Sequence, residues 1–166
     1  MTTTTNDDQQ TKLDRMRYIK NRSAANLALL AIVFDVLYFV LLYQSDVGNY
    51  YYTIITGASV VYNLLFLLFA FLAEEGVKNY IKGYTYLLLA MGVVQIVRIF
   101  IVPMQAHSAV VTVSSVDTPA LGDGKFTWMV VFLILSAVCL MASAVINYSK
   151  CRTLENYLKT LENTAA

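Results

Sequence analysis

The amino-acid sequence predicts an all-α integral membrane protein: a four-helix up-down-up-down transmembrane bundle with a C-terminal amphipathic cytoplasmic helix. Three observations lead to this prediction. The 166 residues are 58% hydrophobic and only 14% charged, whereas soluble domains average about 45–50% apolar and about 25% charged residues. Four long apolar runs divide the chain, and most Lys and Arg residues lie in alternate connecting segments. A soluble core of this size cannot bury so much apolar surface, so we expect lipid to cover part of it.

The first 23 residues are polar and precede the first apolar run. Residues 1–11 are low in complexity, and their composition is typical of disorder. Residues 12–23 hold five cations and one acid, so we expect a basic segment beside the membrane. The five cations are Lys12, Arg15, Arg17, Lys20 and Arg22.

The four apolar runs lie at about residues 24–43, 51–72, 84–102 and 127–146. Each is close to the roughly 20 residues that a helix needs to cross about 30 Å of hydrocarbon. Because a backbone in hydrocarbon must satisfy its own hydrogen bonds, each run is predicted to be a helix. Pro103 follows the third run, where a helix end is expected. The first run has the basic flank of a signal peptide, but Asp35 at its centre and the lack of a small-residue cleavage site predict an uncleaved helix.

The connecting segments predict how the helices follow one another. Segments 44–50 and 73–83 are short, so consecutive helices should lie side by side and antiparallel. Segment 103–126 is long, and we expect it to form an external loop. Its residues 109–116 (AVVTVSSV) favour β structure, and residues 122–124 (GDG) favour a turn. A small hairpin and an irregular loop both fit this pattern.

The distribution of Lys and Arg predicts the orientation. With both termini in the cytoplasm, ten cations face the cytoplasm: five before the first run, Lys78 and Lys82 between the second and third, and three after the fourth. Lys125 then lies outside, and Arg98 lies within the membrane. The opposite orientation violates the positive-inside rule. We therefore expect a protein of the plasma (cell) membrane with cytoplasmic N- and C-termini.

The tail, residues 147–166, is predicted to continue as a cytoplasmic amphipathic helix. Four apolar residues recur at i, i+3, i+4 and i+7 and form one stripe. Charged residues lie off the stripe, so either the bilayer interface or a partner must cover it. The stripe consists of Leu154, Tyr157, Leu158 and Leu161, which are the candidates for a partner interface.

The sequence lacks the residues that most enzyme mechanisms need. His107 is the only histidine, so a zinc site with two histidines is excluded. Cys139 and Cys151 lie about 18 Å apart along one predicted helix, too far for a disulfide. No Gly-rich phosphate loop and no Ser/His pair at membrane depth is present. We expect no enzyme activity, no metal, no cofactor and no nucleic-acid partner; the expected partners are the lipid bilayer and another membrane protein or a second copy of the chain.

Polar residues inside the apolar runs are the candidates for a ligand site or an ion pair. Asp35 lies about 12 Å and Arg98 about 6 Å below the outer ends of their helices. Because side chains lean toward the N-terminus of their own helix, Arg98 leans toward the level of Asp35. The two charges could form a structural ion pair, a polar pocket that binds a ligand or ion, or a contact with another membrane subunit. The candidate residues are Asp35, Asn63, Gln95 and Arg98, and the fourth run adds the small polar stripe of Ser136, Cys139 and Ser143.

Two functional hypotheses follow, since no motif identifies a family. The first is a non-catalytic accessory or assembly subunit of a larger membrane complex, favoured by the small size, the few polar groups and the uncovered tail stripe. The second is a small oligomeric transporter or channel that uses Asp35, Gln95 and Arg98. Four helices cannot enclose a wide pathway, so the second hypothesis requires an oligomer.

Overall fold

A computed structural model describes residues 11, 13–16, 18–43, 50–108, 110–113, 116–119 and 122–165. The predicted disorder of residues 1–11 and the predicted loop at 44–50 fall almost wholly outside these residues. The long elements are all helical: α2 (Arg22–Tyr43), α3 (Tyr50–Lys78), α4 (Lys82–Ile101) and α6 (Asp123–Ala165). In the described part of the chain these four helices are long and apolar enough to cross a membrane.

The helices are longer than the apolar runs that predict them. α3 continues from the apolar run to Lys78, so the connection to α4 shrinks from the predicted 73–83 to residues 79–81. α6 begins at Asp123 and continues without a break through the predicted tail. Hydropathy identifies only the apolar part of a helix, whereas the helical hydrogen bonds continue into polar sequence. Tyr80, in the short connection, has a φ of 57°, a left-handed conformation that reverses the chain within a few residues.

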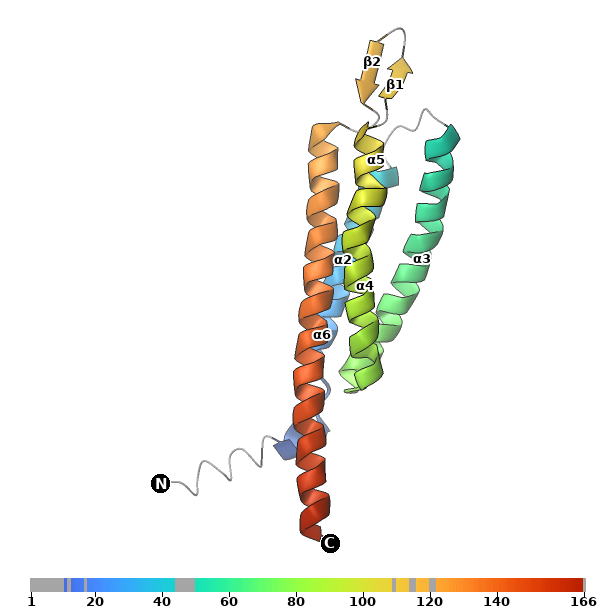
Figure 1. Cartoon of the computed structure of the whole chain (residues 1–166). Helices are drawn as coiled ribbons and strands as arrows, with labels where there is room; N and C mark the ends of the chain where they lie inside the picture. The colour runs from blue at the N-terminus through green and yellow to red at the C-terminus, as the bar shows by residue number, and fades with distance from the viewer. Residues whose placement is uncertain are drawn as a thin grey trace.

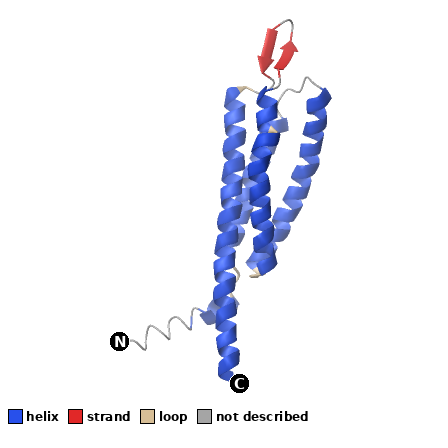
Figure 2. Ribbon diagram, in the orientation of Figure 1, coloured by secondary structure: helices blue, strands red, loops and turns tan. Residues whose placement is uncertain are grey.

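The predicted external loop 103–126 is largely regular structure. It contains the short helix α5 (Pro103–Ser108) and an antiparallel hairpin of β1 (Val110–Val113) and β2 (Val116–Pro119). Its last residues belong to α6. The hairpin pairs Val110 with Pro119 and Val113 with Val116. Figure 2 shows the hairpin at the end of the molecule opposite to the C-terminus. Of the two possibilities for this segment, its described residues therefore form a hairpin.

The four long helices pack as a ring in which α2 and α4 each contact both α3 and α6 (Figure 1). Ser143 donates a hydrogen bond to the carbonyl of Ala24, and Ser136 donates one to the carbonyl of Ala31. The bonded residue numbers increase along α2 where they decrease along α6, so these two helices are antiparallel. The face of α2 toward α6 is built from small residues, which let two helix backbones approach closely. Fully buried residues on this face are Ala24, Ala28 and Ala31.

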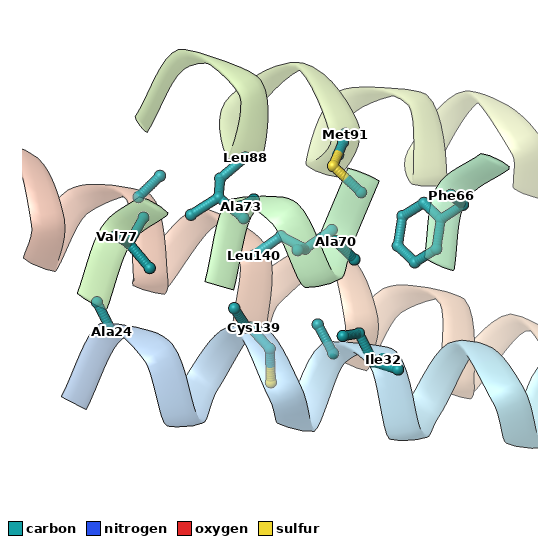
Figure 3. Packing of buried hydrophobic residues seen from close by; sticks show 13 residues of the cluster. Ala24, Ile32, Phe66, Ala70, Ala73, Val77, Leu88, Met91, Cys139 and Leu140 are labelled. Atoms are coloured by element: carbon teal, nitrogen blue, oxygen red, sulfur yellow. The ribbon is translucent and has the colours of Figure 1, made fainter. Parts of the chain in front are cut away.

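The interior contains two apolar clusters. The larger cluster extends from the α3–α4 turn to mid-bundle and includes Ile32, Phe66, Leu88 and Leu140 (Figure 3). The smaller cluster lies at the hairpin end, and its buried members are Tyr38, Leu42, Val102, Met129 and Leu133. All four long helices also carry large apolar side chains on their outer faces, which supports an apolar surrounding.

Gly76 provides a test of the packing between α3 and α4. A Cβ atom built on Gly76 would overlap the aromatic ring of Tyr84, whereas one built on Gly57 of the same helix meets nothing within 4 Å. We expect Gly76→Ala to destabilise the protein by about 1–3 kcal/mol, because the ring must move in a packed interface. Gly57→Ala is the matched control and should leave the melting temperature in detergent unchanged or raise it. Equal melting temperatures for the two variants would contradict this packing.

Candidate functional site

Asp35 lies in the middle of α2, and its side chain is fully buried in the interior of the bundle. One of its carboxylate oxygens, Oδ1, accepts two hydrogen bonds. Gln95 Nε2 donates at 2.8 Å, and Arg98 Nη1 donates at 3.1 Å. Gln95 Nε2 also lies 3.3 Å from Ser136 Oγ, so α6 joins the same network. Asp35 therefore connects α2 to α4, its diagonal neighbour in the ring.

Arg98 is held on several sides, and only 5% of its surface is exposed. Besides Asp35, its guanidinium donates from Nη2 to Ser59 Oγ of α3 at 3.0 Å. Its central carbon lies 4.3 Å from the ring centroid of Tyr38 and 4.6 Å from that of Tyr62. Cation–π contacts of this kind gain strength where water is excluded. A guanidinium suits this position because its planar face stacks on rings while its edge donates hydrogen bonds.

Several buried polar atoms of this layer have no hydrogen-bond partner among the described residues. They are Asp35 Oδ2, Gln95 Oε1 and both polar atoms of the Asn63 side chain. Asn63 is 2% exposed and lies one helical turn from Ser59 on the same face of α3. It therefore faces the interior near the level of Gln95. Each unsatisfied buried group costs about 1–3 kcal/mol, so this layer has unused capacity to bind a small polar species.

A cavity of about 310 Å³ lies between α3 and α4 beside Arg98. Ser59, Tyr62 and Arg98 provide its polar atoms. The rest of its wall is apolar and includes Val97 and Ile101, which are half exposed on the outer face of α4. The cavity therefore leads from the outer surface of the bundle to the guanidinium.

A second polar cluster joins the helices at the end nearer the termini. Asn147 of α6 accepts a hydrogen bond from Asn21 Nδ2 at 3.2 Å and donates one to Thr85 Oγ1 at 2.8 Å. Lys150 Nζ donates to Asn21 Oδ1 at 2.9 Å. These bonds fix the start of α2 and α4 against α6. This cluster is not predictable from the sequence, because isolated Asn and Thr residues near helix ends resemble ordinary interfacial residues.

The tail stripe lies apart from the buried site. Beyond the bundle, α6 continues toward the C-terminus as an extended rod (Figure 1). Leu154 and Tyr157 are half-buried, whereas Leu158 and Leu161 are 42% and 38% exposed. The Tyr157 hydroxyl donates to Asp14 Oδ1 at 2.8 Å, and Glu155 pairs with both Lys82 and Lys159. The N-terminal segment and the start of α4 therefore support the first part of the rod, and its distal apolar residues remain exposed.

Of the predicted site residues, the structure brings Asp35, Gln95 and Arg98 into contact. Asn63 lies in the same interior without a hydrogen bond to them. Sequence reasoning missed Tyr38 and Tyr62, although Tyr38 lies three residues from Asp35 on the same face of α2, which was a usable signal. In the described part of the chain no group of three or more His, Cys, Asp or Glu residues could hold a metal ion, and both cysteines are free thiols. No family model, curated protein or solved structure matches this chain.

The contact between Asp35 and Arg98 can be measured with a double-mutant cycle. Asp35→Asn or Arg98→Gln alone leaves one buried charge unpaired, which should cost about 3–5 kcal/mol of stability. The double variant removes both charges, so it should recover much of the loss and give a strong coupling energy. Melting in detergent measures the four proteins.

The exposed pair of Lys82 and Glu155 provides the matched control, because it also joins α4 to another helix but lies in water. Lys82→Gln and Glu155→Gln should show little coupling. Additive losses for Asp35→Asn and Arg98→Gln would reject the buried pair as a stabilising unit.

Proposed function

We propose that this chain is an up-down-up-down four-helix protein of the cell membrane that serves as a non-catalytic accessory or assembly subunit of a larger membrane complex. The observation that carries the proposal is the distal part of α6, an exposed helix whose apolar stripe has Leu158 and Leu161 on its surface. An isolated helix with such a stripe gains stability from a surface that covers it.

The orientation that we propose places both termini in the cytoplasm. It rests on the ten cations that then face the cytoplasm and the single Lys125 that faces out. Exposed aromatic side chains at both ends of the apolar region support insertion, because such rings are stable at headgroup depth. These residues are Tyr43 and Trp128 at the hairpin end and Tyr18 and Tyr148 at the other.

The buried polar layer supports a structural role within such a subunit. Asp35 is 0% and Arg98 5% exposed, and the apolar clusters lie on both sides of them along the bundle. A pair that is closed on both sides fixes the relative positions of the helices without offering a continuous polar pathway. This arrangement suits a protein whose rigid bundle presents a binding surface elsewhere.

A specific observation favours the alternative, a small oligomeric transporter or channel. The 310 Å³ cavity reaches Arg98 from the outer surface, and Asp35 and Gln95 each keep an oxygen without a partner in the described residues. Intramembrane ionisable residues often mark ion or substrate pathways. In this alternative Asp35, Gln95 and Arg98 form the binding site, and neighbouring copies of the chain complete the pathway.

The proposed orientation predicts which engineered thiols an impermeant reagent can reach. Gly122→Cys, at an exposed position before α6, should react in intact cells, whereas Asn163→Cys near the end of α6 should react only after permeabilisation. The unmodified chain is the control, since both of its cysteines are buried. The reverse labelling pattern would overturn the orientation.

The proposed role of the tail predicts that charged residues in its apolar stripe prevent partner binding. The tagged chain, extracted from its native membrane in mild detergent, should co-purify with a larger membrane protein at fixed stoichiometry, as measured by native mass spectrometry. Leu158→Glu combined with Leu161→Glu should remove that protein, because two carboxylates cannot be buried in an apolar interface.

The matched control places the same two charges on the opposite face, as Asn156→Glu with Asn163→Glu, and should keep the complex. A homo-oligomer with no other protein bound, unaffected by either pair of substitutions, would favour the transporter or channel.

A further inference from the structure

A cavity of about 540 Å³ lies where the N-terminal segment meets the start of α2, beside the α3–α4 turn and α6. Segments far apart in the sequence form it. Four cations and no carboxylate line it, together with apolar and hydroxyl side chains. The lining residues are Arg15, Met16, Ile19, Lys20, Arg22, Ser23, Tyr80, Lys150 and Thr153.

The four cations of this cavity form no direct ion pair within the described residues. None of the ion pairs found there joins Arg15, Lys20, Arg22 or Lys150 to a carboxylate. The nearby acids form their direct contacts elsewhere, since Glu75 pairs with Lys78 at 3.0 Å and Asp14 accepts from Tyr157. The charge of Lys20 nevertheless also acts on Glu75. Among the described residues, Lys150 donates to neutral oxygens, those of Asn21 and Ser23. Four cations gathered in this way repel one another, and an anion in the cavity relieves that repulsion.

The position of the cavity relates it to the membrane surface. It lies at the first residues of α2, a helix that is long and apolar enough to span a bilayer. Met16 and Ile19 add apolar wall, and Ile19 is 56% exposed. A soluble anion needs only the charges, whereas a lipid also places its acyl chains against such apolar residues. The combination therefore fits a molecule with an anionic head and an apolar body.

We propose that this cavity binds the headgroup of an anionic phospholipid. Arg15 and Arg22 pair with the phosphate through their guanidinium groups, which match the geometry of phosphate oxygens. Lys20 and Lys150 add positive charge, and the Ser23 hydroxyl is a further donor. The acyl chains lie along Met16 and Ile19 and the start of α2. The site rests on the membrane insertion that we propose above, but it depends on neither a partner protein nor a transported substrate.

The test uses the purified full chain in detergent with defined lipids. Phosphatidylglycerol should raise the melting temperature and remain bound in native mass spectrometry. Phosphatidylcholine with the same acyl chains should bind about tenfold less, because its headgroup carries no net charge. Inorganic phosphate should not stabilise the protein. Equal binding of the two lipids would overturn the proposal, and stabilisation by inorganic phosphate alone would assign the cavity to a soluble anion instead.

Matched variants localise the site. Arg15→Gln with Arg22→Gln should weaken phosphatidylglycerol binding about tenfold, because two cations near the headgroup are lost. Arg15→Lys with Arg22→Lys keeps the charge and should retain most of the binding. Arg152→Gln with Lys159→Gln removes two cations from the same end of the molecule outside the cavity and should leave binding unchanged.

If the two double Gln variants lose phosphatidylglycerol binding equally, the binding depends on general surface charge, and the proposed site is overturned. If Arg15→Gln with Arg22→Gln fails to fold, Lys20→Gln gives the same comparison with one exposed charge removed. Unchanged phosphatidylglycerol binding in Lys20→Gln would then also count against the cavity.

Discussion

The contact between Asp35 and Arg98 is the interaction on which the arrangement of the helices depends. Each charged residue costs roughly 2.5–3.5 kcal/mol at the centre of a membrane helix. Both are tolerated here because they meet across the diagonal of the ring, with Ser59 of α3 and Ser136 of α6 in the same network. All four long helices thus contribute to one polar layer. A shift of any helix by one turn would separate a donor from its acceptor, so the layer fixes the relative heights of the helices.

Close packing of small residues makes this layer possible. The carbonyls of Ala24 and Ala31 accept hydrogen bonds from serines of α6, which requires the two backbones to approach closely. On the other side of α6, Gly92 of α4 leaves room for Met141, whose Cγ lies 3.1 Å from where a Cβ would be. An apolar surrounding removes the hydrophobic force between helices, and there such packing and interhelical hydrogen bonds supply much of the association energy. Polar and apolar interactions therefore depend on the same close approach.

The sequence predicted the long helices and the shared level of Asp35 and Arg98, because hydropathy and helix rise determine which residues lie at which depth. It could not predict that Tyr38 and Tyr62 stack on the guanidinium. The outer and interior faces of these helices are both apolar, so the sequence pattern does not indicate which face of each helix points inward. It also placed the end of α3 too early, because Glu74 and Glu75 continue the helix beyond the apolar run. The charge count suggested an orientation, but the meeting of Arg15 with Lys150 in one cavity depends on the turn before α2.

The buried layer also separates the two functional hypotheses on physical grounds. A transport site must be reached from both sides of the membrane in turn, whereas apolar residues such as Leu88 and Leu133 lie on either side of Asp35 along the bundle. Transport would therefore require the helices to separate at contacts made by small residues. The van der Waals attraction of these contacts falls steeply as two helices move apart. An accessory role requires no such movement, because the exposed end of α6 already lies outside the bundle. Asp35, Gln95 and Asn63 have buried polar atoms without a hydrogen-bond partner among the described residues, and a purely structural role does not require such atoms. Binding of a small ion or of water there would account for them in either case.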